Sequence, residues 1–314
     1  MSKNLIVSLS TAVVLSVSGM VFAQVPAAPV APAAADKTAA YPALALQVQL
    51  ARAGFSPGEI DGKDGANTKK ALAAYIDIYK AAPTSTEEML ESYTLTAQDV
   101  AGPFIEIPAD MMDKAKLKTL GYTSLMEALG EQFHTAPALL ALLNPGVEFT
   151  AGTAIEVPRV PRVNPTPAVA TESNDAVEAF KVIVSKGEST VRVYNSKGTL
   201  LMYAPVTSGS DKDPLPLGEW AVTTVVRNPP FNYNPDLFWD ANPAHAKATI
   251  PPGPNGPVGV IWIDLSKEHY GLHGTPEPGK IGHTDSHGCV RLTNWDVVKL
   301  AGMVKKGTQV LFVE

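Results

Sequence analysis

Apolar and polar residues alternate along much of the C-terminal half of the chain. From Phe180 onward, short alternating runs are separated by turn residues such as Lys186-Gly187 and Gly198. Because successive side chains of a strand point to opposite faces, this pattern predicts half-buried β-strands. The expected strands are 180–184, 190–194, 199–206, 219–226, 258–265, 271–273 and 308–313. Strands that recur with turns between them indicate an all-β sandwich or barrel, so we expect a mainly β domain over 177–314.

One helix is expected to interrupt these strands. Thr293, with Asp296 three residues later, forms a capping box, and Gly307 is the expected end of the helix. Between them lies a stripe of apolar residues at helical spacing: Val297, Val298, Leu300, Ala301 and Val304. Cys289 therefore lies four residues before a helix N-cap, where the helix dipole would give a thiolate a small stabilisation.

The N-terminal half shows helical spacing instead. Apolar residues at this spacing begin at Tyr41 and stop at Gly54, and a turn-dense segment leads to a second helix that starts near Thr68. This pattern predicts a small helical domain over 41–80.

Residues 91–158 are expected to form a small α+β module. The module combines a β-like run at 92–96 with a helix start near Met126, an Asn-Pro-Gly turn at 144–146 and a strand that ends at Val157.

The first 23 residues have the features of a secretory signal peptide. Lys3 precedes an almost wholly apolar run from Leu5 to Val21, and Val21-Phe22-Ala23 fits a cleavage site before Gln24. The alternative is an uncleaved membrane anchor, but the run is short for a bilayer span of ~20 residues. We therefore expect an exported, periplasmic chain that is not embedded in the membrane after cleavage.

Proline marks the expected linkers. Residues 24–40 are rich in Pro and Ala, and residues 159–176 combine prolines with polar residues, so both segments can bury little apolar surface. The 227–257 segment differs, because its eight prolines and four aromatic residues lie inside the expected β domain. A connection of this length is usually functional, such as a lid or a substrate wall, although a proline-stiffened surface loop fits equally well. We expect it to lie beside the site.

Charge and cysteine content narrow the function. The chain of 314 residues suits two or three domains, and its net charge of −6 argues against nucleic acid as a partner. Cys289 is the only cysteine. In an exported chain an unpaired cysteine indicates a reactive thiol or an intermolecular bond, with a buried inert cysteine as the structural alternative.

The surroundings of Cys289 favour the reactive thiol. It lies in the run Ser286-His287-Gly288-Cys289-Val290-Arg291, and three of the six histidines lie within 16 positions of it. A thiol at its ordinary pKa of ~8.5 is mostly protonated at neutral pH and needs a nearby base or cation to become a nucleophile. We therefore expect Cys289 to be a nucleophile.

From Phe180 to Glu314 the chain resembles the L,D-transpeptidase catalytic domain of the YkuD type. The resemblance rests on a strand that ends in His-Gly-Thr, on Ser-His-Gly-Cys-Val-Arg-Leu with the first histidine 16 residues before the cysteine, and on an upstream Pro/Gly-rich segment at 250–259. In that family the cysteine attacks the carbonyl after the L-centre of a diamino acid in a peptidoglycan stem. The terminal D-alanine leaves, and the amine of a second stem takes the acyl group.

The resemblance implies that Cys289 is the nucleophile and His273 the general base. His287, two residues before Cys289, would point the opposite way in an extended loop, so we expect it to orient the loop or to contact substrate. The backbone N–H groups of Gly288 and Cys289 can face the oxyanion of the intermediate. Arg291 suits a stem-peptide carboxylate, with a salt bridge inside the sheet as the alternative.

Ser286 and Gly274 are further candidates for substrate binding, as supporting positions beside the cysteine and the histidine. We expect no metal and no cofactor.

Two N-terminal segments also resemble wall-binding modules. Residues 44–75 follow the peptidoglycan-binding-like pattern of a helix with Leu-Gln, then Gly-Phe-x-Pro-Gly-x-Ile-Asp-Gly, then Gly-x-x-Thr-x-x-Ala-Leu. Residues 126–158 resemble the second half of a LysM domain, separated from the first strand by an insertion at 97–125. The resemblance implies that these segments bind glycan. Where the insertion has removed glycan binding, the LysM-like segment would serve only as a spacer.

The expected partners are peptidoglycan stems as donor and amine acceptor, or a lipoprotein that becomes attached to the wall. Three alternatives remain open: an L,D-carboxypeptidase that hydrolyses the same bond, a non-catalytic peptidoglycan-binding protein, and a zinc hydrolase. The last would use His273, His283, His287 and Cys289, whose spacing matches no usual zinc pattern.

Overall fold

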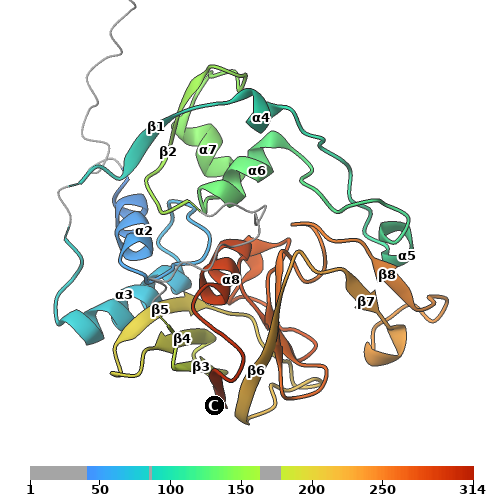
Figure 1. Ribbon diagram of the computed structural model, residues 1–314. Helices are drawn as coiled ribbons and strands as arrows, with labels where there is room; N and C mark the ends of the chain where they lie inside the picture. The colour runs from blue at the N-terminus through green and yellow to red at the C-terminus, as the bar shows by residue number, and fades with distance from the viewer. Residues whose placement is uncertain (1–40, 85–86, 163–177) are drawn as a thin grey trace, which may run out of the picture. The chain divides into compact units, whose positions relative to one another are not determined.

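The computed structural model describes residues 41–84, 87–162 and 178–314, all of which belong to one compact unit (Figure 1). The expected signal peptide, the 24–40 linker and nearly all of the 159–176 linker lie outside the described residues. Within the described residues, no helix has both the length and the apolar character needed to cross a bilayer.

An eight-stranded sheet forms the C-terminal region, so the expected mainly β fold is confirmed there. Its strand order is β11-β10-β9-β6-β12-β3-β4-β5. The strands are β3 (Lys181–Ser185), β4 (Thr190–Tyr194), β5 (Leu200–Pro205), β6 (Gly218–Arg227), β9 (Ile261–Leu265), β10 (Gly271–His273), β11 (Val290–Arg291) and β12 (Gln309–Val313). The pairs β12–β3 and β10–β11 are parallel, and the other neighbours are antiparallel.

The sheet curls back on itself. Thr207, just after β5, forms an antiparallel bridge with Arg291 of β11, so the chain after one edge strand reaches the opposite edge. The buried residues of the strands meet inside this curl and form a core with apolar side chains of α8 (Asn294–Ala301).

Helix α8 is shorter than the sequence predicted. Its N-cap is as expected, because the Thr293 side chain accepts a hydrogen bond from the backbone N–H of Asp296. The helix ends at Ala301, whereas Gly307, with φ at +89°, lies in the turn before β12. Met303 and Val304 still pack against the core after the helix has ended, which explains why the apolar pattern continued.

The helical segment consists of α2 (Pro42–Arg52) and α3 (Ala66–Tyr79). Gln47 organises the turn between them, since its Oε1 accepts from the Gly62 N–H at 2.9 Å and its Nε2 donates to Asp61 Oδ1 at 2.9 Å. The segment is joined to β5, where Phe55 forms a parallel bridge with Tyr203 and their rings stack 6.1 Å apart.

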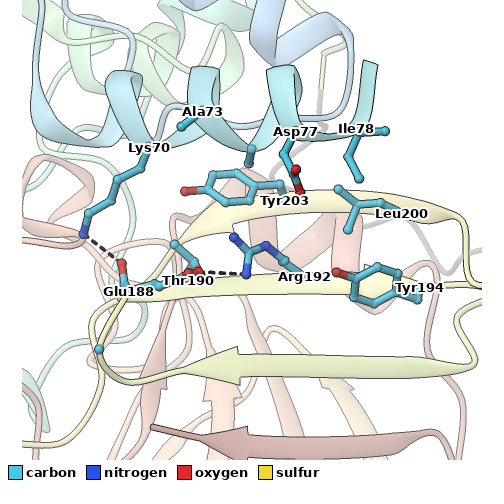
Figure 2. A pocket seen from close by; sticks show the side chains of 12 residues that line it. Lys70, Ala73, Asp77, Ile78, Glu188, Thr190, Arg192, Tyr194, Leu200 and Tyr203 are labelled. Atoms are coloured by element: carbon cyan, nitrogen blue, oxygen red, sulfur yellow. Dashed lines mark hydrogen bonds and ion pairs between the residues drawn. The ribbon is translucent and has the colours of Figure 1, made fainter. Parts of the chain in front are cut away.

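A cleft of about 620 Å³ lies between α3 and strands β4 and β5, and its lining residues are drawn in Figure 2. Lys70 Nζ crosses it to donate to the backbone oxygen of Glu188 at 2.7 Å, and Arg192 pairs with the Glu188 carboxylate at 2.7 Å. The cations that line this cleft are therefore already engaged with Glu188, and Lys70 joins the helix to the sheet edge.

The expected α+β module is built on the antiparallel pair β1 (Leu90–Thr94) and β2 (Ala154–Pro158). The pair packs with α6 (Leu125–Gln132) and α7 (Pro137–Leu143) around a core that includes Leu129, Phe133 and Ile155. The 97–125 insertion contains two short helices, α4 (Ala97–Val100) and α5 (Met111–Lys114).

The 227–257 segment contains regular structure that the sequence did not reveal. Strands β7 (Phe231–Tyr233) and β8 (Ala248–Ile250) pair antiparallel, with a short 3₁₀ helix at Pro235–Leu237 between them. Three-residue strands among prolines carry too few alternating positions to be recognised. We call residues 231–250 the hairpin.

A buried carboxyl group joins α6 to α8. Glu131 Oε1 accepts a hydrogen bond from Asn294 Nδ2 at 3.2 Å. Burial is the main reason that the pKa of Glu131 is raised, to about 8. Glu131 is therefore protonated in the folded chain at neutral pH.

Replacement of Glu131 by Gln should make stability less dependent on pH. A carboxyl group whose pKa is higher in the folded chain stabilises that state below its ordinary pKa of 4.5, and this stabilisation is lost as pH rises toward 8. Gln keeps a neutral acceptor for Asn294, so its advantage over the wild type should grow by on the order of 1 kcal/mol per pH unit between pH 5 and 8. Urea unfolding at pH 5, 6.5 and 8 measures this, and parallel curves for the two proteins would contradict it. Replacement of the exposed Glu148 by Gln is the control.

Candidate active site

Strands β10 and β11 bring the His-Gly-Thr motif and the Ser-His-Gly-Cys-Val-Arg motif side by side. In their parallel register Leu272 pairs with Val290, and His273 pairs with Arg291. Leu272 and Val290 are buried in the core of the sheet. Because neighbouring residues on a strand face opposite sides, His273 and Arg291 project together from the other face. Cys289 directly precedes β11, and its thiol lies close enough to Arg291 and to the backbone of Gly271 for both to affect its pKa.

His273 is held as a neutral imidazole. Its Nδ1 lies 2.7 Å from the backbone oxygen of Gly274, and a carbonyl oxygen can only accept, so Nδ1 carries the proton. Nε2 is left with a free lone pair, and no described residue forms a hydrogen bond with it. The ring stacks on Trp262 at 5.4 Å. Burial, together with the positive charge of Arg291, lowers the pKa of His273 to about 3.

The thiol of Cys289 is partly exposed and predominantly protonated. Its Sγ donates to the backbone oxygen of His269 at 3.5 Å. Burial raises the pKa of the Cys289 thiol, while the backbone of Gly271 and the charge of Arg291 act in the opposite direction. The resting site is therefore a neutral thiol beside a neutral imidazole.

Arg291 supplies a positive charge that forms no salt bridge with a described carboxylate, although the charges of Glu277 and Asp240 act on it from nearby. Its backbone N–H and oxygen bond to Thr207 at 2.8 and 3.0 Å, which fixes the residue in the sheet. Its guanidinium forms no hydrogen bond or ion pair with residues 41–84, 87–162 or 178–314. The salt bridge that the sequence left open as an alternative is thus not found in the described part of the chain.

A closed turn presents Cys289. Ser286 Oγ donates to the backbone oxygen of Cys289 at 2.6 Å and accepts from the N–H of Gly288 at 3.1 Å. Gly288 has φ at +103°, and a Cβ there would lie 2.8 Å from Cε1 of Tyr270. Only glycine fits such a position.

This turn bears on two residues that the sequence singled out. The hydroxyl of Ser286 is bonded within the loop, where it positions the cysteine, and its expected contact with substrate stays a prediction. The N–H of Gly288 is likewise taken, whereas the N–H of Cys289 has no acceptor among the described residues. Of the two N–H groups expected to face an oxyanion, that of Cys289 is the one left free.

Gly274 is placed against the start of α8. A Cβ at Gly274 would lie 2.1 Å from Oδ1 of Asn294, the atom that also accepts from the Val260 N–H at 3.2 Å. The absence of a side chain at Gly274 thus allows the close packing that fixes the carbonyl bonded to His273. Its expected contact with substrate stays a prediction.

His287 is engaged by the hairpin. Its Nε2 lies 2.9 Å from Asp240 Oδ1, and its ring packs against Phe238 at 5.2 Å and Trp239 at 6.0 Å. The hairpin therefore lies beside the Cys289 turn, where the 227–257 segment was expected. The role of His287 in orienting the loop or binding substrate stays a prediction.

The four residues of the zinc alternative are held in separate interactions. His283 is exposed, His287 bonds to Asp240, and His273 bonds to Gly274. In the described ranges, no group of three His, Cys, Asp or Glu side chains is arranged to hold a metal ion.

Four residues of the site were not singled out in the sequence: Asp240, Trp262, Tyr270 and Asn294. Asp240 is 47 residues from its partner His287, so the sequence contains no local signal for this pair. Trp262 and Tyr270 looked like ordinary strand aromatics. Asn294, next to the N-cap of α8, could have been noticed only as a polar residue beside an apolar stripe.

Comparisons with solved structures and with family models both give matches. A solved L,D-transpeptidase from Mycobacterium smegmatis aligns with 43% of this chain and 59% of its own length, at 20% identity and a TM-score of 0.36. The model of the YkuD family, described as the L,D-transpeptidase catalytic domain, matches residues 179–312.

Two relatives match over a larger part of their length. The protein named L,D-transpeptidase YkuD of Bacillus licheniformis is 30% identical over 188 residues, which cover 59% of this chain and 91% of the relative. Its namesake from Bacillus subtilis is 29% identical over 187 residues, with the same coverage. The chain described here belongs to the YkuD family of L,D-transpeptidases and is a transpeptidase enzyme.

Proposed function

We propose that this transpeptidase is an exported, wall-associated enzyme that acts on peptidoglycan stem peptides through a thioester on Cys289. One observation carries the proposal: the neutral His273, whose Nε2 lone pair is unoccupied, pairs in register with Arg291, two residues after Cys289. A thiol and an available base in one site are what nucleophilic acyl transfer requires.

In the acylation step, His273 Nε2 takes the thiol proton as Sγ of Cys289 attacks the carbonyl carbon after the L-centre of the donor stem. The free N–H of Cys289 donates to the oxyanion of the tetrahedral intermediate. The C–N bond then breaks, and the proton on Nε2 passes to the departing amine of D-alanine.

In the second step, the amine of an acceptor attacks the thioester. His273 removes the proton of the attacking amine, and the sulfur leaves and is reprotonated. No external energy source is needed, because the thioester conserves the free energy of one amide bond for the next.

The pKa values support general-base catalysis instead of a preformed ion pair. The pKa of the thiol is raised and that of His273 is lowered to about 3, so both groups are neutral before substrate arrives. Transfer of the thiol proton to His273 therefore accompanies the attack on the carbonyl. At that moment the forming C–S bond draws negative charge away from the sulfur.

Arg291 supports the choice of a donor that carries a carboxylate. A guanidinium that is largely removed from water and unpaired within the described chain is a strong site for a planar anion. We assign it to a carboxylate of the stem peptide. The proposal has two further parts. Residues 41–80 and 91–158 bind the wall, and a lipoprotein can take the place of a stem as acceptor.

Removal of the nucleophile or the base should abolish or reduce acyl transfer without loss of the fold. With a tetrapeptide stem and an amine acceptor, Cys289→Ser should give no cross-linked product, and His273→Ala should be slower by ~10²- to 10⁴-fold. His283→Ala is the matched control, since this exposed histidine should change the rate by less than ~2-fold. Mass spectrometry of the product mixture reports both the reaction and the acceptor. Full activity in Cys289→Ser, or equal losses in the two histidine variants, would refute the assignment.

A carbapenem should acylate the same sulfur, as the family resemblance implies. Intact-mass spectrometry should show one adduct on the wild type and none on Cys289→Ser. A wild-type protein that stays unmodified would count against the thioester mechanism.

Arg291 should influence the ionisation of the thiol. Because the positive charge lowers the pKa of Cys289, Arg291→Gln should leave less thiolate at a given pH and slow alkylation by iodoacetamide at pH 7.5 by ~3- to 10-fold. The rate should still rise with pH in both proteins, with no step near pH 6.5, since His273 is already neutral there. Arg192→Gln, whose arginine pairs with Glu188 beside the cleft of Figure 2, is the control. Faster alkylation in Arg291→Gln would contradict this electrostatic role.

A further inference from the structure

The 97–125 insertion packs against the hairpin. Its residues share an apolar cluster with both strands of the hairpin, and Leu120, Tyr233 and Ile250 are the buried centre of that cluster. Figure 1 shows α5 of the insertion next to β8. The segment that interrupts the LysM-like pattern thus has a packing partner in the catalytic region.

Backbone hydrogen bonds fix the end of the insertion to the chain that follows the hairpin. The Leu120 N–H donates to the Pro252 oxygen at 2.9 Å, and the Asn255 N–H donates to the Leu120 oxygen at 3.0 Å. Asn255 Nδ2 also donates to the Gly121 oxygen at 2.9 Å. These bonds leave little freedom for the base of the hairpin to move away from the insertion.

A chain of polar side chains connects α5 to the hairpin. Asp110 is the N-cap of α5, and its second carboxylate oxygen lies 3.0 Å from Nε2 of His245. Because a carboxylate only accepts, Nε2 carries the proton in this pair. The Nδ1 atom of the same ring forms a hydrogen bond with the Tyr233 hydroxyl at 3.0 Å. His245 is the one side chain here that bonds to the insertion and to β7 at the same time.

The connection continues to the cysteine turn. The ring of Tyr233 stacks with Phe238 at 5.8 Å, and Phe238 packs edge-on against His287 at 5.2 Å. Asp240 adds its hydrogen bond to His287 at 2.9 Å. The contacts therefore run without a break from α5 through the hairpin to a residue two positions before Cys289.

We infer that the insertion acts as a brace, which means that it holds the hairpin in place, and that His245 is the positioning residue of this brace. The braced hairpin favours an amine over water as acyl acceptor. The inference rests on the proposed thioester mechanism. A thioester reacts with whichever nucleophile reaches it, so a wall fixed beside Cys289 decides how freely water competes. His245 acts through the hairpin and contacts no reacting atom.

The test compares His245→Ala and His245→Gln with wild type in the full chain. A tetrapeptide stem and a fixed concentration of a second stem as acceptor give two products, and the measured quantity is the ratio of hydrolysed to cross-linked product. Loss of two hydrogen bonds should raise this ratio ~5- to 10-fold in His245→Ala. Gln can still donate to Asp110 from its amide and should restore most of the wild-type ratio.

Asp113→Ala is the matched control. Asp113 lies in the same helix α5, but its ion pair with Lys116 at 2.7 Å is exposed and does not reach the hairpin. This variant should keep the product ratio within ~2-fold of wild type. If His245→Ala does not fold, Tyr233→Phe removes only the hydroxyl that His245 binds and replaces it in the comparison.

Hydrogen exchange of the backbone amides of residues 231–250 gives a second readout, which does not depend on the transpeptidase reaction. Exchange should be faster in His245→Ala and return toward wild type in His245→Gln. Unchanged exchange in His245→Ala would contradict the claim that the insertion braces the hairpin. Faster exchange together with a wild-type or lower ratio of hydrolysed to cross-linked product would contradict acceptor selection. If the wild type forms no acyl-enzyme, the proposed function fails and acceptor selection with it, while the exchange data still decide the brace.

Discussion

The parallel register of β10 and β11 is the constraint on which the site depends. It directs Leu272 and Val290 into the core, so burial of two apolar side chains fixes which way His273 and Arg291 face, with Cys289 directly before β11. A shift of one strand by a single residue would place the histidine in the core and a leucine at the site. The hydrophobic effect thus sets the geometry of polar groups that contribute nothing to the core themselves.

The site combines this geometry with unusual ionisation. Burial keeps the imidazole and the thiol neutral, whereas Arg291 retains its charge beside them. A neutral resting site costs less to bury than an ion pair. Under the proposed mechanism, the sulfur loses its proton only as it attacks the substrate carbonyl.

The sequence predicted most of the strands of the large sheet and the α8 cap, because alternation and capping are local signals. Proton transfer between Cys289 and His273 stays a prediction. The sequence placed the start of β9 at 258, but the strand begins at Ile261, since Gly259 at φ +59° lies in a turn. Parallel pairing of β10 with β11 and the bond between His287 and Asp240 could not be predicted, because each joins distant segments through tertiary packing. For the same reason, the bond of Ser286 to its own turn was not foreseen.

The bridge between Thr207 and Arg291 has a consequence for how a peptide can approach. Both backbone groups of Arg291 are already bonded to Thr207, so the outer edge of β11 offers no open ladder at this point. Many proteins bind an extended peptide by pairing it as a further strand of a sheet, and this mode of recognition is blocked here. Under the proposed function, a stem peptide would instead cross the face that carries His273 and Arg291 and be held there by side chains.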